Sequence, residues 1–400
     1  MSARLARPSA PALRQDASAH PFPATADAPT RPAIAEALLR EVTPADLARL
    51  QNLSGYPMVS VLLPTTPGAR LDLEDQANLS ALVEGAQRRL AAELPGAPVD
   101  ELIAPLRRLA TQIADSPTGP GLVLFAGAGI VEAYRIALSP APRVVVDPSF
   151  ATRDLARSVA ENPPYRLLTL ASGSARIYLG TGAQLHERAT GGFPVREPAT
   201  ASPADRRGHL HQGEPTHRGA HRWDRFLRRV DDALDADQRT RGLPLIVAAA
   251  EPLASHYRRR TSQQIVGTIP GNRERTPTVR LAYLARPVIE LHLAQQRQEA
   301  LDGLERAVDK GRAASGISQV WQAASDGRIA LLLVDPAFTY PALAAPDGRD
   351  LTRSRDPEHP DVLDDAVDEI IERVARRGGR VCFTTLNGTG DQIAAVLETR

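Results

Sequence analysis

The sequence predicts a chain of α/β class, built as three α/β domains. In each third of its 400 residues, short apolar runs of strand length alternate with amphipathic stretches of helix length. The clearest case begins at Tyr165, where two apolar runs flank Ser172-Gly173-Ser174 and predict a β-hairpin. A chain of this length is expected to form two or three domains. Its 42% hydrophobic and 24% charged residues allow globular cores outside the loops.

Changes in composition predict where these domains begin and end. The first 33 residues are rich in Ala, Pro, Ser and Arg without an apolar core, which predicts a disordered tail. The sequence Asn162-Pro163-Pro164 is typical of a boundary. The expected segments are a tail at 1–33, an N-terminal domain at 34–161, a central domain at 162–286 with a long loop at 190–221, and a C-terminal domain at 287–400.

The first domain alternates between helical and strand patterns. Thr43-Pro44 followed by Asp46 is a typical helix start. Gly127-Ala128-Gly129 resembles part of a dinucleotide-binding fingerprint, but a strand follows where that fingerprint requires a helix, so a hairpin turn is predicted. The expected helices are Ile34–Arg40, Thr43–Leu50, Leu79–Leu94, Val99–Ile113 and Asp154–Glu161, and the expected strands are Met58–Leu63, Gly121–Phe125, Ile130–Leu138 and Val144–Val146.

One amphipathic helix follows the long loop of the central domain. Its apolar stripe consists of Trp223, Phe226, Leu227, Val230 and Leu234. Its other face carries Arg222, Arg225 and Arg229, which the nearby Asp224, Asp231 and Asp232 could neutralise. Around it the expected strands are Tyr165–Leu170, Ala175–Leu179 and Leu243–Ala250, with a helix at His256–Gln264 and a turn-rich stretch between Ile265–Thr268 and Val279–Leu284.

The C-terminal third again alternates between helix and strand, which predicts a three-layer α/β/α domain. A long helix is expected from Pro287 towards Val308. Further helices are expected at Ile317–Ala324, Val362–Arg376 and Asp391–Leu397, and strands at Ile329–Val334 and Val381–Thr385. Asn387-Gly388-Thr389-Gly390, just before the last helix, could bind an anion but is more typical of a tight turn.

The loop from Thr190 to Ala220 is rich in Gly, Pro, Arg and His and has no apolar face to bury. Long loops without secondary structure are usually functional or disordered. One hypothesis is a metal site, formed by His209, His211, His217, His221 and Glu214. A second is that arginines and partly charged imidazoles bind RNA phosphates. A third is a solvated loop without a partner.

The composition excludes several classes of function. Lys310 is the only lysine and is not followed by Ser or Thr, so the chain has no phosphate-binding Walker loop. Cys382 is the only cysteine, which excludes internal disulfides and multi-cysteine zinc sites. No apolar run approaches the length of a membrane span. Scattered serines and histidines form no catalytic triad order.

Several segments resemble the archaeo-eukaryotic class-1 peptide release factors and Pelota. They are Tyr165–Gly180 with the loop and the Trp223–Leu234 helix, Leu243–Glu251, and the ending Phe383–Leu397. Leu63-Pro64-Thr65 at the end of a strand and the run Arg225–Asp231 are similar to the bacterial archaeo-eukaryotic release factor-like family. The resemblance implies a ribonuclease H-like central domain and a C-terminal domain of the kink-turn-binding ribosomal protein type.

The resemblance also implies a ribosome-associated protein that reaches the tRNA site. Release factors carry Gly-Gly-Gln at the tip of the central loop, and its glutamine helps water to attack the peptidyl-tRNA ester. Here Gly191-Gly192 is followed by Phe193, and Gln212 lies between His211 and Gly213, so the tripeptide is missing. The candidate RNA-binding residues are Arg206, Arg207, His209, His211, Gln212, Arg218, His221, Arg222, Arg225 and Arg229.

We therefore expect a cytoplasmic, ribosome-associated protein that acts in translation stalling, rescue or dormancy. No catalytic residue, metal ligand or cofactor is assigned, and neither a membrane nor DNA is expected as a partner. The expected partner is the ribosome, through ribosomal RNA and the tRNA site, and a GTPase partner is left open. The alternative is a hydrolase of peptidyl-tRNA or another RNA-linked ester, with a loop histidine as base. A third hypothesis is a stress protein that keeps the fold and binds a small molecule.

Overall fold

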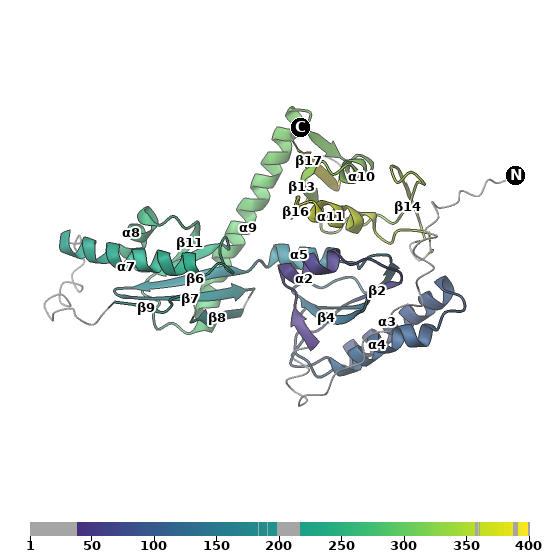
Figure 1. Cartoon of the computed structure of the whole chain (residues 1–400), viewed down its shortest axis with the longest axis horizontal. Helices are drawn as coiled ribbons and strands as arrows, with labels where there is room; N and C mark the ends of the chain where they lie inside the picture. The colour runs from purple at the N-terminus through teal and green to yellow at the C-terminus, as the bar shows by residue number, and fades with distance from the viewer. Residues whose placement is uncertain are drawn as a thin grey trace. The chain divides into compact units, whose positions relative to one another are not determined.

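Three larger sheets and one small hairpin contain the strands of the described residues. The computed structural model describes residues 38–182, 184–189, 191–197, 217–356, 359, 361–386 and 391–398, and for 217–222 it describes the helical backbone alone. Contacts group the chain into two units: residues up to Glu161 with those from Arg297 onward, and Asn162–Gln296. The α/β class is confirmed (Figure 1). The division into three domains stays a prediction.

The first sheet has the strand order β1-β4-β3-β2-β5. These strands are β1 (Leu39–Glu41), β2 (Met58–Pro64), β3 (Gly121–Gly127), β4 (Ile130–Ile136) and β5 (Arg143–Asp147). Helices α3 (Leu73–Glu93) and α4 (Val99–Gln112) run side by side along one face (Figure 1), while α2 (Pro44–Gln51) and α5 (Arg153–Glu161) cover the other. Strand β2 is buried on both faces because successive side chains alternate between the two helical layers.

The sequence correctly predicts the start of α2 and the hairpin between β3 and β4. Thr43 and Asp46 form a reciprocal capping box at the first turn of α2. The helix predicted at Ile34–Arg40 is wrong in its described part, because Leu39–Glu41 form β1 and pair in parallel with β4. Leu39 is fully buried in the layer under α3 and α4, and this tertiary contact outweighs the local helical pattern.

The second sheet lies in the unit Asn162–Gln296 and has the order β11-β10-β6-β7-β8. Its strands are β6 (Tyr165–Ala171), β7 (Ser174–Thr181), β8 (Gln184–Arg188), β10 (Leu245–Ala249) and β11 (Ile265–Pro270), with the short β9 (Val195–Arg196) beside β7. Strands β6, β7 and β8 are antiparallel, whereas β6, β10 and β11 are parallel. Helices α7 (His217–Ala236) and α8 (Leu253–Arg260) pack on one face.

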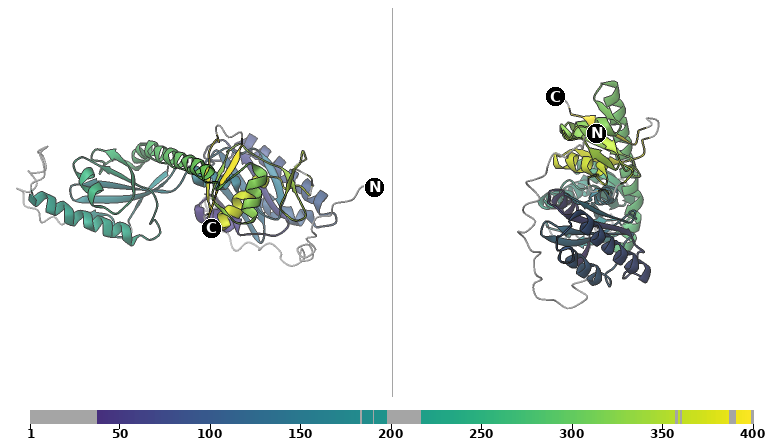
Figure 2. Two further views of the ribbon diagram at one scale, coloured as in Figure 1. Left: turned by 90° about the horizontal axis from the view of Figure 1, so that it is seen from above. Right: turned by 90° about the vertical axis from the view of Figure 1, so that its right-hand side faces the viewer.

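The opposite face of the second sheet is covered by the start of α9 (Thr278–Asp309), and α7 and α9 are seen on opposite sides of the sheet in Figure 2. The helix predicted from Pro287 thus begins nine residues earlier. Leu281, Ala285 and Ile289 recur every fourth residue and are buried against the sheet, so the apolar stripe sets the start of the helix. Pro287 lies inside the helix without ending it.

The third sheet has the order β12-β17-β13-β16. Its strands are β12 (Ala313–Ser315), β13 (Ile329–Val334), β16 (Arg380–Phe383) and β17 (Ile393–Leu397), and a small hairpin follows β13 as β14 (Ala342–Ala344) and β15 (Leu351–Arg353). Helices α10 (Ile317–Ser325) and α11 (Ala366–Arg376) pack on one face, and the end of α9 packs on the other. This arrangement confirms the predicted α/β/α layering.

The helix predicted at Asp391–Leu397 is wrong. Ile393–Leu397 form β17, which pairs with both β12 and β13 in the middle of the sheet. Ile393 and Ala395 face the layer of α10 and α11, while Ala394 faces the end of α9. A short apolar run buried on both faces has no period that separates strand from helix, which explains the error. The predicted turn at Asn387–Gly390 lies outside the described residues.

Candidate functional site

The Gly191-Gly192 pair, at the beginning of the predicted long loop, forms a turn packed on its own domain. Both glycines have positive φ, at 68° and 95°. A Cβ at Gly191 would lie 3.2 Å from the Ala233 carbonyl oxygen at the end of α7. Phe193 is 6% exposed in the core beneath α7, and Val195 is buried beside it. The long loop predicted from Thr190 therefore begins with two buried apolar residues, Phe193 and Val195. The sequence interpretation missed both.

Most of the predicted RNA-binding residues lie outside the described residues or side chains. Arg206, Arg207, His209, His211 and Gln212 belong to the segment that the structure does not describe. Arg218, His221 and Arg222 lie on α7, where only the backbone is described. Arg225 and Arg229 are exposed on α7, and a guanidinium nitrogen of Arg229 donates to the Arg196 carbonyl oxygen at 3.2 Å. RNA binding by this set stays a prediction.

Helix α7 is held by the apolar stripe that the sequence predicts. Phe226, Leu227, Val230 and Leu234 are each no more than 2% exposed and pack against the sheet. A helix buried along one stripe must present its remaining positions elsewhere, and here Arg225, Arg228 and Arg229 are exposed. The sheet therefore fixes which side chains α7 presents to solvent.

Asp224 and Asp231 of α7 contact α8 and the residue that follows it. A carboxylate oxygen of Asp224 lies 2.8 Å from His256 Nε2 and 3.1 Å from Arg260 Nη1. Asp231 accepts hydrogen bonds from the hydroxyls of Tyr257, at 2.7 Å, and Thr261, at 2.8 Å. Burial raises the pKa of Asp231 despite these bonds. Two of the three acids expected to neutralise the basic face thus serve to fix α8 on α7.

Helix α8 adds a second set of arginines that the sequence interpretation missed. Arg258, Arg259 and Arg260 are consecutive, form the last turn of α8 and are all exposed. The signal was three adjacent arginines at a helix end, where positive charge is favoured by the helix dipole. We call the exposed arginines of the two helices the arginine face: Arg225, Arg228, Arg229, Arg258, Arg259 and Arg260. Exposed acids near them are Asp232 and Asp235 on α7 and Glu251, which lies just before α8.

Within the described residues, no group of three or more His, Cys, Asp or Glu side chains could hold a metal ion. The histidines and Glu214 of the metal hypothesis lie outside the described residues or on the part of α7 whose side chains are not described, so the hypothesis stays open. In the part of the chain that the structure describes, no helix has the length and apolar character needed to cross a membrane.

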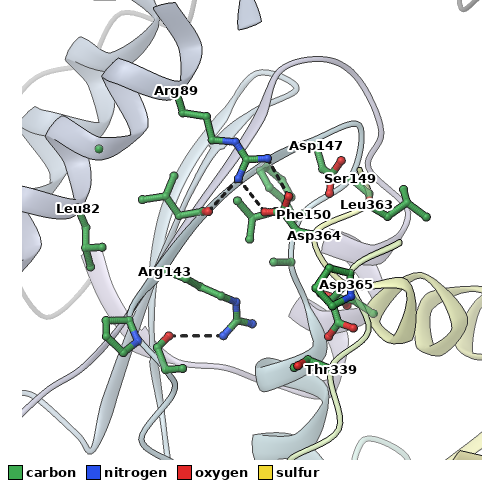
Figure 3. A pocket seen from close by; sticks show the side chains of 18 of the residues that line it. Leu82, Arg89, Arg143, Asp147, Ser149, Phe150, Thr339, Leu363, Asp364 and Asp365 are labelled. Carbon is green, nitrogen blue, oxygen red and sulfur yellow. Dashed lines mark hydrogen bonds and ion pairs between the residues drawn. The ribbon is translucent and has the colours of Figure 1, made fainter. Parts of the chain in front are cut away.

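A second feature lies in the other unit, as a cavity of about 730 Å³. Its walls come from α3, from β5 with the residues on either side of it, and from residues 339, 341, 363–365, 368 and 369 (Figure 3). Leu82, Val144 and Phe150 supply part of an apolar lining. A volume of this size is typical of small-molecule sites.

Most of the charged side chains around this cavity are satisfied internally. Arg89 donates to both carboxylate oxygens of Asp364 at 2.8 Å, as Figure 3 shows, and to Glu93 at 2.7 Å. Asp365 accepts from Arg153 at 2.6 Å and from two backbone N–H groups, one of them at the start of α11. These contacts join the first and third sheets, which belong to the same unit.

Two carboxylates in the cavity wall differ from this pattern. Asp147, at the end of β5, has no hydrogen bond or ion pair with any described residue, and burial, followed by repulsion from Asp364, raises its pKa to about 8. Asp368, on α11, has a buried Oδ1 without a hydrogen-bond partner among the described residues. Burial and then repulsion from Glu372 raise the pKa of Asp368 well above its ordinary value.

Comparison with known proteins finds one family model that matches part of the chain. Residues 164–328 match the family described as bacterial archaeo-eukaryotic release factor family 3. No curated protein matches the chain. Three solved structures are among those that match the chain. The archaeal translation termination factor aRF1 is 16% identical, with 91% of this chain and 100% of that chain covered, at a TM-score of 0.23. Pelota of Archaeoglobus fulgidus is 15% identical, with 90% and 93% covered, at a TM-score of 0.33. Archaeal Pelota in a model of the ribosome-bound protein with ABCE1 is 14% identical, with 90% and 95% covered, at a TM-score of 0.40.

Proposed function

We propose, from the confirmed likeness of residues 164–328 to the bacterial archaeo-eukaryotic release factor family, that the protein binds the ribosome and contacts ribosomal RNA through its arginine face. It acts there in translation stalling, rescue or dormancy, without hydrolysing peptidyl-tRNA. The single observation that carries this proposal is the exposed set of six arginines on α7 and α8.

The chemistry of the arginine face suits phosphate recognition. A guanidinium group is always charged and presents paired N–H donors that match the oxygens of a phosphate. Among the six, only Arg260 forms an ion pair with a described residue, Asp224, so the other five charges are not consumed within the domain. Since α7 and α8 pack on the same face of the sheet, the six arginines lie on two neighbouring helices. RNA offers the regularly spaced anions that such a surface can bind.

Two observations support the proposal that the protein does not hydrolyse peptidyl-tRNA: its sequence, and the geometry of the turn at Gly191. The chain contains no Gly-Gly-Gln, and the residue after Gly191-Gly192 is Phe193. Its ring is buried under α7 and cannot position a water molecule at an ester. The alternative of a loop histidine acting as base has no described residue in its favour.

The proposal is tested by sedimentation of the full chain with ribosomes through sucrose gradients at several salt concentrations. We expect cosedimentation at low salt and a steep loss with rising salt, because phosphate contacts release counterions. The double variant Arg258→Gln/Arg259→Gln should reduce the slope of log K against log salt by about two, one for each lost phosphate contact.

A matched control is Arg280→Gln/Arg286→Gln, which removes two exposed arginines from α9 on the opposite face of the same sheet. We expect this control to bind ribosomes with the salt dependence of the unaltered chain. If the α8 variant and the α9 control lose binding equally, the attraction comes from overall charge and the arginine face is not the contact. Failure of the unaltered chain to cosediment at low salt would end the proposal.

A further inference from the structure

The cavity between α3, β5 and α11 contains two acids without partners in a wall whose other buried charges are matched. In the described part of the chain, Arg89, Asp364 and Asp365 each have an ion-paired partner. No described residue forms an ion pair with Asp147, and the buried Oδ1 of Asp368 has no hydrogen-bond partner among the described residues. A buried polar group left without a hydrogen bond costs free energy, and unmatched groups of this kind concentrate at functional sites.

We propose that this cavity binds a small organic cation, with amine or guanidinium groups joined by a short apolar stem, whose N–H donors are held by Asp147 and Asp368. The proposal is independent of the RNA contact, which belongs to the other unit of the chain. The stem would lie against Leu82, Val144 and Phe150, which line the same cavity.

The charge of the wall selects this class of ligand. Once ionised, Asp147 and Asp368 repel an anion, and a neutral apolar molecule would leave both carboxylates unmatched. An N–H donor with a positive charge gives the strongest hydrogen bond to a carboxylate. Arg143 is held by Asp154 at 2.7 Å, and Arg88 is exposed to solvent, so the cavity-facing positive charges are engaged or hydrated.

A metal ion fits this wall less well than an extended organic cation. The described residues contain no group of three or more His, Cys, Asp or Glu side chains able to hold a metal. Asp147 is the last residue of β5 and Asp368 lies on α11, so the two carboxylates come from different walls. A ligand with several N–H donors along its length can reach both, whereas a single ion must gather its ligands at one point.

The pH dependence follows from the groups that face these acids. Those acting on Asp147 are Asp364, Arg89, Glu369 and Glu93, and those acting on Asp368 are Glu372, Asp365, Arg143 and Arg153. Because the pKa of Asp147 is raised to about 8, this carboxyl is protonated at pH 7 and must lose its proton to hold a cation. Binding through Asp147 should therefore become about tenfold tighter between pH 7 and pH 9.

Calorimetric titration of the full chain with agmatine and, separately, with spermidine tests the proposal. We expect one molecule of agmatine per chain, tighter binding at pH 9 than at pH 7, and loss of binding in Asp147→Asn and in Asp368→Asn. Glu84→Gln, an exposed acid on α3 outside the cavity, should bind as the unaltered chain does. Circular dichroism should show both asparagine variants folded, since each loses a carboxylate that lacks a partner.

Three outcomes would overturn the proposal. One is the absence of binding heat at millimolar agmatine and spermidine in the unaltered chain. Another is unchanged binding in both Asp147→Asn and Asp368→Asn, which would place the cation elsewhere. The third is saturable binding of MgCl₂ without binding of the organic cations. If the same two variants abolished the binding of MgCl₂, the site would be assigned to a metal ion.

Discussion

Replacing Glu372 by glutamine tests the charge balance between the first and third sheets. Glu372 is 1% exposed, on the side of α11 that faces α2 and α5, and its Oε1 accepts the Thr152 hydroxyl hydrogen bond at 3.2 Å. Its Oε2 is buried without a partner among the described residues. Burial, with a second contribution from Glu369, raises the pKa of Glu372 to about 8. Glutamine keeps the shape and an acceptor for Thr152 but cannot ionise.

The size of the effect follows from proton linkage. The folded chain holds a proton on Glu372 up to pH 8, whereas the unfolded chain releases it near the ordinary value of 4.5. Stability is therefore lost as the pH rises through the interval between these two values. At pH 7, some 2.5 pH units above the unfolded pKa, the loss is about 3 kcal/mol, because each unit corresponds to about 1.4 kcal/mol. Glu372→Gln should raise the free energy of unfolding at pH 7 by up to this amount.

The assay is urea unfolding at pH 5, 7 and 9, followed by the fluorescence of Trp321. This indole is 1% exposed and packs in the same core cluster as α11, so it reports on the unit that contains Glu372. The background variant Trp223→Phe removes the tryptophan of the other unit. Glu299→Gln, an exposed acid on α9, is the control and should leave the pH dependence unchanged. A Glu372→Gln variant with the same loss of stability between pH 5 and pH 9 as the unaltered chain would refute the reasoning.

Three further predictions concern the other parts of the chain. Phe193→Ala should destabilise the central unit by about 3–5 kcal/mol, since it removes a buried ring under α7, and unfolding monitored by Trp223 fluorescence measures it. Thr43→Ala should cost about 1 kcal/mol in urea unfolding, because it removes the side-chain cap of α2. Phe193→Gln creates the sequence Gly-Gly-Gln. This variant should show no peptidyl-tRNA cleavage with or without ribosomes, because position 193 faces the core. Peptide release above background would contradict the conclusion that position 193 is buried.

The sequence predicts well the elements whose signals are local. The cap of α2 depends on Thr43 and Asp46, three residues apart, and the β6–β7 hairpin depends on the turn at Gly173 with positive φ. The apolar stripe of α7 is likewise read from spacing alone. Each of these features is decided within a few residues, where propensity and side-chain direction suffice.

The elements that the sequence mispredicts depend on distant partners. Leu39 becomes part of a strand because β4, about ninety residues away, offers an unpaired edge. Ile393–Leu397 become a central strand because β12 and β13 stand on both sides. No pattern within either segment contains this information, since a short apolar run fits a buried strand and a buried helix equally well.

The candidate site shows the same division. The exposure of Arg225 and Arg229 could be predicted because neither belongs to the apolar stripe of α7. This placement follows from residue spacing within one helix. The contribution of α8 could not be predicted, because it depends on Asp224 and Asp231 reaching His256 and Tyr257 across the helix pair. The unmatched acids of the cavity were equally hidden, since Asp147 and Asp368 come together only when the first and third sheets pack in one unit.

The two proposed sites should respond to different conditions because their charges lie in different surroundings. The arginine face is exposed, so dissolved ions screen it over about 8 Å at physiological ionic strength, and its binding should depend on salt. The carboxylates of the cavity are largely withdrawn from solvent, so salt screens them little and protonation governs them. Ribosome binding that follows salt, and cation binding that follows pH, would therefore separate the two sites in one preparation of the chain. If both activities followed the same variable, at least one of them would have been assigned to the wrong surface.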